Sequence, residues 1–216
     1  MGLHRDGSYY GLSAVDAHVR RLIWHQLCFL DIRTCEASGP RPQIRADEFD
    51  TKFPLAVDDI DLESSTPPAK DSGRWTDNSL SLVRFECNEL HRYIWNERPK
   101  IEKKKSSLTA LLGKVEKFKT AMEKKHFRNI DQLDPIQMLA LHVYGLLYRR
   151  MHVMILHRYH STEERLMPER LREIMLTSAT FVLEHAIEIE TNPLFRPWSW
   201  YIGKCPKHFL PFLIRR

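Results

Sequence analysis

The chain has 216 residues, of which 43% are hydrophobic and 28% are charged. This length and apolar fraction suffice for a sizeable core, and they exclude a disordered or low-complexity protein. The four cysteines follow no paired spacing, so they predict no disulfide framework, and we expect a reducing, intracellular compartment. The most apolar stretch, residues 136–148, is too short to span a bilayer, and we expect no membrane partner.

The net charge of +5 is distributed unevenly along the chain. Residues 98–128 contain eleven Lys and Arg against three Glu, which gives this segment +8 and leaves −3 for the remainder. The basic character therefore belongs to one segment, and charge runs of this kind are most often solvated helix faces.

Helical periodicity recurs along the chain, whereas strand signals are almost absent. Ser13 is predicted to cap a first helix that ends at residues 39–42, where two prolines occur. Its predicted buried face comprises Val15, Val19, Leu22, Ile23, Leu27 and Leu30. A long acidic connection follows, and Thr76 or Asp77 then caps a second helix that Pro99 ends. The predicted buried face of that helix comprises Leu80, Val83, Cys87, Leu90 and Ile94.

Three more helices are predicted in the second half. The basic segment carries a heptad-like seam of Leu108, Leu111, Val115, Phe118 and Met122. Asp134 and Pro135 begin a fourth helix, whose run 138–156 is apolar on almost every face, as in the central helix of a bundle. Ser161 and Glu164 match a capping box, and a helix from Pro168 to Asn192 follows. The buried stripe of that helix comprises Leu171, Ile174, Met175, Ser178, Val182, Ala186 and Ile189.

These elements predict an all-α fold, an irregular multi-helix bundle with a long loop between the first two main helices. Phosphate loops and nucleophile elbows are missing from the sequence, and no Cys/His quartet has the spacing of a zinc site. His157 and His160 share a helix face, but no acidic residue lies between them. We therefore expect no catalysis, no metal and no cofactor.

Two other function classes stay open. The acidic run Asp58, Asp59 and Asp61 is compatible with an all-α enzyme of the terpene-synthase type, provided that these residues share one helix face. The lysines at 103–105 and 124–125 are compatible with a nucleic-acid-binding helix, although no aromatic residues interleave with them.

Six residues are singled out as candidate site or anchoring positions. A small-molecule effector is expected between the first and fourth helices, where Trp24, His25, His142 and Tyr148 offer polar groups amid apolar surface. Arg21 and Asp31 are expected to be structural.

Short stretches spread from residue 1 to about residue 201 share their order and spacing with a known family. In the first half they are Gly2–Ser8, Arg20–Trp24, Leu30–Asp31, Gly39–Ile44, Asp47 with Asp50, and Phe53 to Asp59. In the second half they are Trp75–Asp77, Ser81–Glu86, Leu156–His160, Glu190–Asn192 and Trp198–Tyr201. Together they resemble the fungal-specific transcription factor domain, the regulatory middle region of fungal zinc binuclear-cluster activators.

The resemblance implies transcription regulation in the nucleus, including that of secondary metabolism, by a helical regulatory, effector-sensing or protein-interaction domain. The implied partners are the transcription machinery, a second copy of the chain, or a small-molecule effector. Members of the family also carry an N-terminal six-cysteine zinc cluster that reads DNA, and this motif is missing from the 216 residues. We therefore expect a partial regulatory domain over 1–204, a divergent tail over 205–216, and DNA binding only through the missing cluster.

Overall fold

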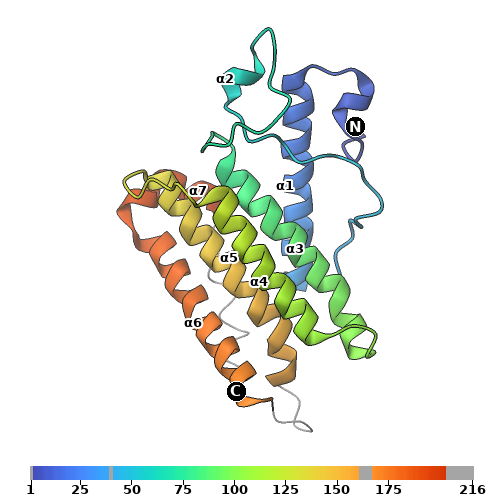
Figure 1. The fold of residues 1–216 in the computed structure, drawn as a ribbon, viewed down its shortest axis with the longest axis vertical. Helices are drawn as coiled ribbons and strands as arrows, with labels where there is room; N and C mark the ends of the chain where they lie inside the picture. Colours follow the sequence, from blue (N-terminus) through green and yellow to red (C-terminus); the bar gives the residue numbers. More distant parts are fainter. Residues whose placement is uncertain (1, 39–40, 161–166, 203–216) are drawn as a thin grey trace. The chain divides into compact units, whose positions relative to one another are not determined.

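The computed structural model describes residues 2–38, 41–160 and 167–202 (Figure 1). Every regular element in this part of the chain is helical, which confirms the predicted all-α, multi-helix fold. In chain order the elements are η1 (Gly7–Tyr10), α1 (Ala14–Ser38), α2 (Asp59–Leu62), α3 (Ser79–Glu102), α4 (Leu108–His126), α5 (Pro135–His160), α6 (Glu169–Thr191), η2 (Pro193–Trp198) and α7 (Ser199–Ile202). Within the described ranges, no helix has both the length and the apolar character that crossing a membrane requires.

The chain forms two compact units, Met1–Arg92 and Tyr93–Arg216. The first unit contains η1, α1, α2 and most of α3. The second unit contains the end of α3 together with α4, α5, α6, η2 and α7.

In the first unit, a fully buried carboxylate joins three segments that are distant in sequence. Arg21 on α1 donates from Nε and Nη2 to the two oxygens of Asp6, each at 2.7 Å. The same carboxylate accepts the backbone N–H groups of Ser8 at 3.1 Å and of Lys52 at 2.9 Å. The guanidinium of Arg21 holds the pKa of Asp6 well below its usual range. A single ionised side chain therefore fixes the N-terminal segment and the segment near residue 52 against α1.

Further hydrogen bonds tie the same segments together. The backbone N–H of Asp6 donates to Asp50 at 2.9 Å, and the Thr51 hydroxyl donates to the carbonyl of Leu3 at 2.7 Å. Asp31, near the end of α1, accepts the backbone N–H groups of Gln43 and Ile44 at 3.0 Å. Stretches that carry the family resemblance therefore contact one another in the first unit.

The predicted buried face of α1 is wrong. Val19, Ile23, Leu27 and Leu30 are 41–49% exposed, and the opposite side of α1 is buried instead. The buried side comprises Ala17, His18, His25, Cys28, Ile32 and Cys35. The reason is polar: Arg21 and His25 satisfy groups in the N-terminal segment and near residue 52, which an aliphatic face cannot do. The four exposed residues are called the α1 stripe below.

Three cysteines of the first unit are buried thiols. Cys28, Cys35 and Cys87 form no disulfide, and Cys28 is completely buried, as is common for a free cysteine. Burial raises the pKa of both Cys28 and Cys87.

The long connection between α1 and α3 is confirmed, and α2 is its only regular element within the described residues. The side-chain amide of Asn78 donates to the carbonyl of Leu55 at 2.5 Å, and the backbone N–H of Ala56 donates to Asp71 at 2.9 Å. Val57 and Leu62 are buried. The connection is therefore folded onto the first unit by specific bonds.

The predicted buried face of α3 is confirmed, because each of its five residues is at most 6% exposed. The predicted end at Pro99 is wrong, since α3 continues to Glu102 with Pro99 inside its last turns. Lys104 adopts a left-handed backbone conformation (φ 56°), and the N–H groups of Lys105 and Lys104 donate to the carbonyls of Lys100 and Ile101. This Schellman geometry, rather than the proline, ends the helix. Proline near a helix end removes only one backbone bond.

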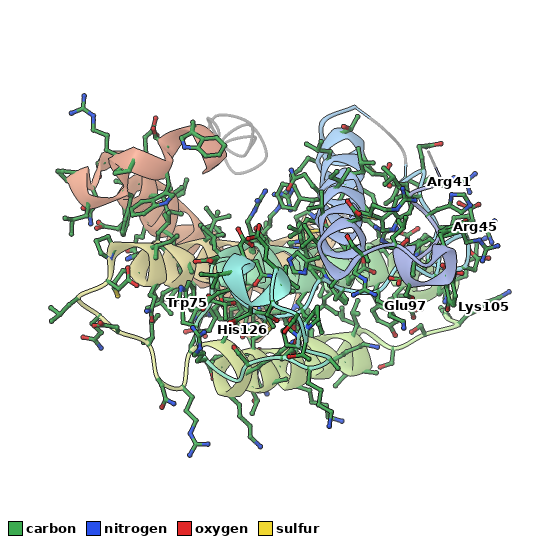
Figure 2. All side chains as sticks on the ribbon, turned by 90° about the horizontal axis from the view of Figure 1, so that it is seen from above. Arg41, Arg45, Trp75, Glu97, Lys105 and His126 are labelled. Carbon is green, nitrogen blue, oxygen red and sulfur yellow. The ribbon has the colours of Figure 1, made fainter. Side chains whose placement is uncertain are left out.

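Glu97 closes the turn between α3 and α4. Its carboxylate accepts from Lys100 Nζ at 2.7 Å and from the Ser106 hydroxyl at 2.9 Å. Figure 2 shows Glu97 and Lys105 at this turn. The Ser107 side chain then caps α4 by accepting the backbone N–H of Ala110.

In the second unit, α5 lies between α4 and α6 (Figure 1; Figure 2). The predicted α4 seam is confirmed at Leu111, Val115 and Met122, which are at most 3% exposed. The predicted central helix is confirmed too, since α5 is buried at most positions from Leu139 to Leu156. Met175, Ser178, Val182 and Ala186 form the buried side of α6.

Two predicted features lie outside the described residues. They are the Ser161–Glu164 capping box and the divergent tail 205–216.

We predict that Arg21→Ala lowers the free energy of unfolding by about 3–5 kcal/mol, because it leaves the buried Asp6 carboxylate without its counter-charge. Arg45→Ala is the matched control, since the Arg45–Asp47 pair is 67% exposed on both sides and should contribute less than about 1 kcal/mol. Urea denaturation measures both variants. Equal losses for the two variants would contradict the anchoring role of Arg21.

A second prediction concerns the close approach of α5 and α6 at Gly145. A Cβ atom there would overlap the ring of His185, so Gly145→Ala should destabilise the protein by about 1–3 kcal/mol. Gly113 on α4 has open space around its Cβ position, and Gly113→Ala should instead stabilise it by about 0.5–1 kcal/mol. Thermal unfolding of both variants checks the opposite signs.

Candidate functional site

The four predicted effector-site residues divide between the two units. Trp24 and His25 belong to the first unit, whereas His142 and Tyr148 belong to the second. A shared pocket stays a prediction, and each pair is described with its own neighbours.

His25 is buried and fully engaged with its surroundings. Its Nε2–H donates to the carbonyl of Lys52 at 3.1 Å, and its ring stacks on Phe53 with centroids 4.3 Å apart. Burial lowers the pKa of His25 to about 4, so the imidazole is neutral at pH 7. This histidine contributes an aromatic surface and a fixed hydrogen bond.

Trp24, which precedes His25, has a polar group without a hydrogen-bond partner among the described residues. Its indole meets the ring of Phe49 edge-on, with centroids 5.3 Å apart. Its Nε1–H is buried and has no hydrogen-bond partner among the described residues. Buried donors are nearly always satisfied, so this N–H is one to which a ligand acceptor could bind.

In the second unit, His142 faces a second histidine. Its Nδ1 lies 3.2 Å from Nδ1 of His185, so one ring donates to the other across the α5–α6 contact. Phe195 covers the His142 ring at 5.6 Å. Burial lowers the pKa of both histidines, and the nearby His142 ring lowers the pKa of His185 further.

Tyr148 joins α5 to α4. Its hydroxyl donates to Glu116 Oε1 at 2.8 Å, and Nε2 of His152 lies 3.1 Å from the same oxygen. Burial raises the pKa of Tyr148, with a further contribution from the Glu116 carboxylate. The hydrogen-bonding groups of His142 and Tyr148 are therefore already paired within the unit.

An arginine pairs with two carboxylates of the acidic run. Arg74 lies 2.5 Å from Asp58 and 3.6 Å from Asp61, and Asp58 also accepts the backbone N–H of Asp77. Asp59 and Asp61 belong to the four-residue helix α2, whereas the sequence predicted a loop. In the described part of the chain, no three His, Cys, Asp or Glu side chains gather as a metal site would require.

The lysines of α4 differ in their surroundings: Lys114 and Lys119 lie over the rings of Tyr93 and Tyr148. Lys117, Lys124 and Lys125 are exposed. Nδ1 of His157 lies 3.1 Å from the carbonyl of Val153 on the same helix, and the side chain of His160 lies outside the described residues.

The partners that fix these residues are not evident from the sequence pattern. Asp6, Glu116 and His185 are each far in sequence from the side chains that they bind. The sequence shows only that a polar or charged residue interrupts an apolar helix pattern. This does not identify the residue that it binds.

We predict that His25 makes the stability depend on pH. Its pKa is lowered on folding, so the contribution is complete above the unfolded value near 6.5 and is lost as the pH falls toward 4. Between pH 7 and pH 5 the loss should be about 2 kcal/mol larger in the wild type than in His25→Phe. Urea titrations at both pH values check this. Identical pH dependence in the two proteins would contradict it.

Comparison with known proteins gives similarity to fungal regulators over almost the whole chain. A transcriptional regulatory protein of Schizosaccharomyces pombe is 26% identical over 95% of this chain and 32% of its own length. The aurofusarin cluster transcription factor of Gibberella zeae is 26% identical over 98% of this chain and 32% of its own length. A C6 finger domain transcription factor of Aspergillus fumigatus is 22% identical over 94% of this chain and 30% of its own length.

No protein-family model matches the chain, and no solved structure matches it significantly. The relatives confirm the resemblance found in the sequence, and they do not favour the enzymatic or nucleic-acid-binding alternatives. The chain spans about one third of the length of these curated relatives. It is therefore a homologue of a region of fungal transcription regulators.

Proposed function

We propose that this chain is a regulatory region that controls transcription in the nucleus through protein contacts. The observation that carries the proposal is the similarity of 94–98% of the chain to about one third of each transcription regulator described above. The chain thus corresponds to a defined portion of proteins whose names state transcriptional control. The aurofusarin relative further supports a role in regulating genes for a secondary metabolite.

The α1 stripe supports a protein-contact mechanism. Val19, Ile23, Leu27 and Leu30 follow one another at helical spacing along one side of α1 and are all exposed. Contiguous exposed apolar surface of this kind marks interaction sites. A component of the transcription machinery with an apolar groove is the partner that fits this face.

A small-molecule effector is part of the same proposal. The buried, unpartnered indole N–H of Trp24 supports it, because an effector with an acceptor group would satisfy that donor. His25 and Phe49 supply aromatic surface beside it.

A reporter assay tests the proposed function. The chain fused to an unrelated DNA-binding domain should change reporter transcription in a fungal cell relative to that domain alone. Ile23→Glu with Leu27→Glu should bring the reporter back to the level of that domain alone, because two charges disrupt an apolar contact without touching the core. Ile60→Glu, at a single apolar residue that is 77% exposed, should leave the response unchanged.

Two results would overturn the proposal. One is a stable nuclear fusion that leaves transcription at the level of the DNA-binding domain alone. The other is an equal response from the α1 double variant and from the wild type, which would exclude the stripe as the contact surface.

A further inference from the structure

Two helix faces of the second unit carry opposite charge and are exposed in the part of the chain that the structure describes. The first is the outward face of α4, defined here by Gly113, Lys117, Ala121 and Lys124. All four residues are exposed, and they lie opposite the buried seam of Leu111, Val115 and Met122. Lys117 and Lys124 form no ion pair within the described residues. They are seven residues apart, which places them about 10 Å apart along the same side of the helix.

The second is the outward face of α6, defined here by Glu173, Leu176, Glu184 and Ile187. Leu176 is 48% exposed and Ile187 is 59% exposed, on the side opposite the buried residues of this helix. Glu173 and Glu184 are exposed, and each precedes one of these aliphatic residues by three positions, which places them on the same side of the helix. Neither carboxylate has an ion-pair partner in the part of the chain that the structure describes.

One molecule cannot bring these two faces together. Helix α5 lies between α4 and α6 (Figure 1), and both helices turn their buried sides inward. The α4 and α6 faces consequently point away from each other. A contact between them requires two molecules.

The small residues of the α4 face leave space for an apolar contact. Gly113 and Ala121 leave room on α4 for the aliphatic side chains of Leu176 and Ile187. The lysines of α4 carry long flexible stems, so their ammonium groups can reach acidic residues beside the aliphatic contact. Opposite charges across a contact fix partner choice and register.

We propose that the α6 face of one molecule docks on the α4 face of a second copy of this chain. The contact joins two different surfaces, so a pair of molecules retains one free α4 face and one free α6 face and can bind further copies. Its ionic part weakens as salt rises, because exposed charges are screened. The expected behaviour is self-association that grows with protein concentration and declines with ionic strength.

Charge reversal tests the proposal by sedimentation velocity on the full chain. Lys117→Glu with Lys124→Glu should leave the protein monomeric, and so should Glu173→Lys with Glu184→Lys. An equimolar mixture of the two double variants should associate again, because each reversed face then meets an oppositely charged one. The chain carrying all four changes should associate like the wild type.

Lys103→Glu with Lys105→Glu is the matched control. These exposed lysines lie in the turn before α4, and the variant changes the net charge by the same amount as the α4 variant. It should associate like the wild type at matched ionic strength. Circular dichroism checks that each variant retains its helix content.

Specific results would overturn the proposal. One is a wild type that stays monomeric at every concentration and salt level. Another is association that persists in both double variants, which would place the contact elsewhere, for instance on the α1 stripe. Failure of the mixture to associate would exclude direct pairing of the two faces.

Discussion

A carboxylate that is buried on folding loses its hydrogen bonds to water, and protein donors must replace them. The first unit depends on the donors that surround the Asp6 carboxylate. Arg21 supplies the charge, while the backbone near residue 52 and the start of η1 supply further N–H groups. Because these donors come from three segments, the orientation of α1 is set by its polar side. The α1 stripe lies on the opposite side of the helix and is exposed. The exposure of the α1 stripe is therefore a consequence of the buried Arg21–Asp6 ion pair.

The second unit is organised around an apolar helix rather than around a buried charge. Helix α5 is hydrophobic on nearly all sides, so it must be covered from more than one direction, and α4 and α6 do so. Two polar contacts specify how they pack: the Tyr148 hydroxyl joins α5 to Glu116 of α4, and His142 joins it to His185 of α6. Gly145 lets the His185 ring approach the α5 backbone. Apolar burial gives the affinity between these helices, and the polar pairs select one register.

The helices were predictable from sequence because periodicity, capping residues and prolines act locally. The buried faces of α3 and α4 followed as well, since each has only one apolar side. The buried side of α1 was not predictable from its periodicity, because it is determined by polar partners rather than by hydrophobicity. The main partner, Asp6, is distant in sequence, and the residue pattern of α1 does not reveal it. Pro99 failed as a stop signal because the Schellman geometry at Lys104 determines the end of α3. For the predicted effector site, the sequence identified suitable aromatic and polar residues. It did not identify Glu116, His185 and Phe53, which already contact three of the four predicted side chains.

The buried thiols of the first unit have a practical consequence. The thiolate is the reactive form of cysteine, and burial raises the pKa of Cys28 and Cys87 while also excluding reagents. Cys28 lies on α1 and Cys87 lies on α3, and both side chains are completely buried. Alkylation at these positions is therefore limited by opening of the first unit. Because alkylation adds a known mass to the cysteine that reacts, mass spectrometry can follow the opening of the first unit at Cys28 and at Cys87 separately.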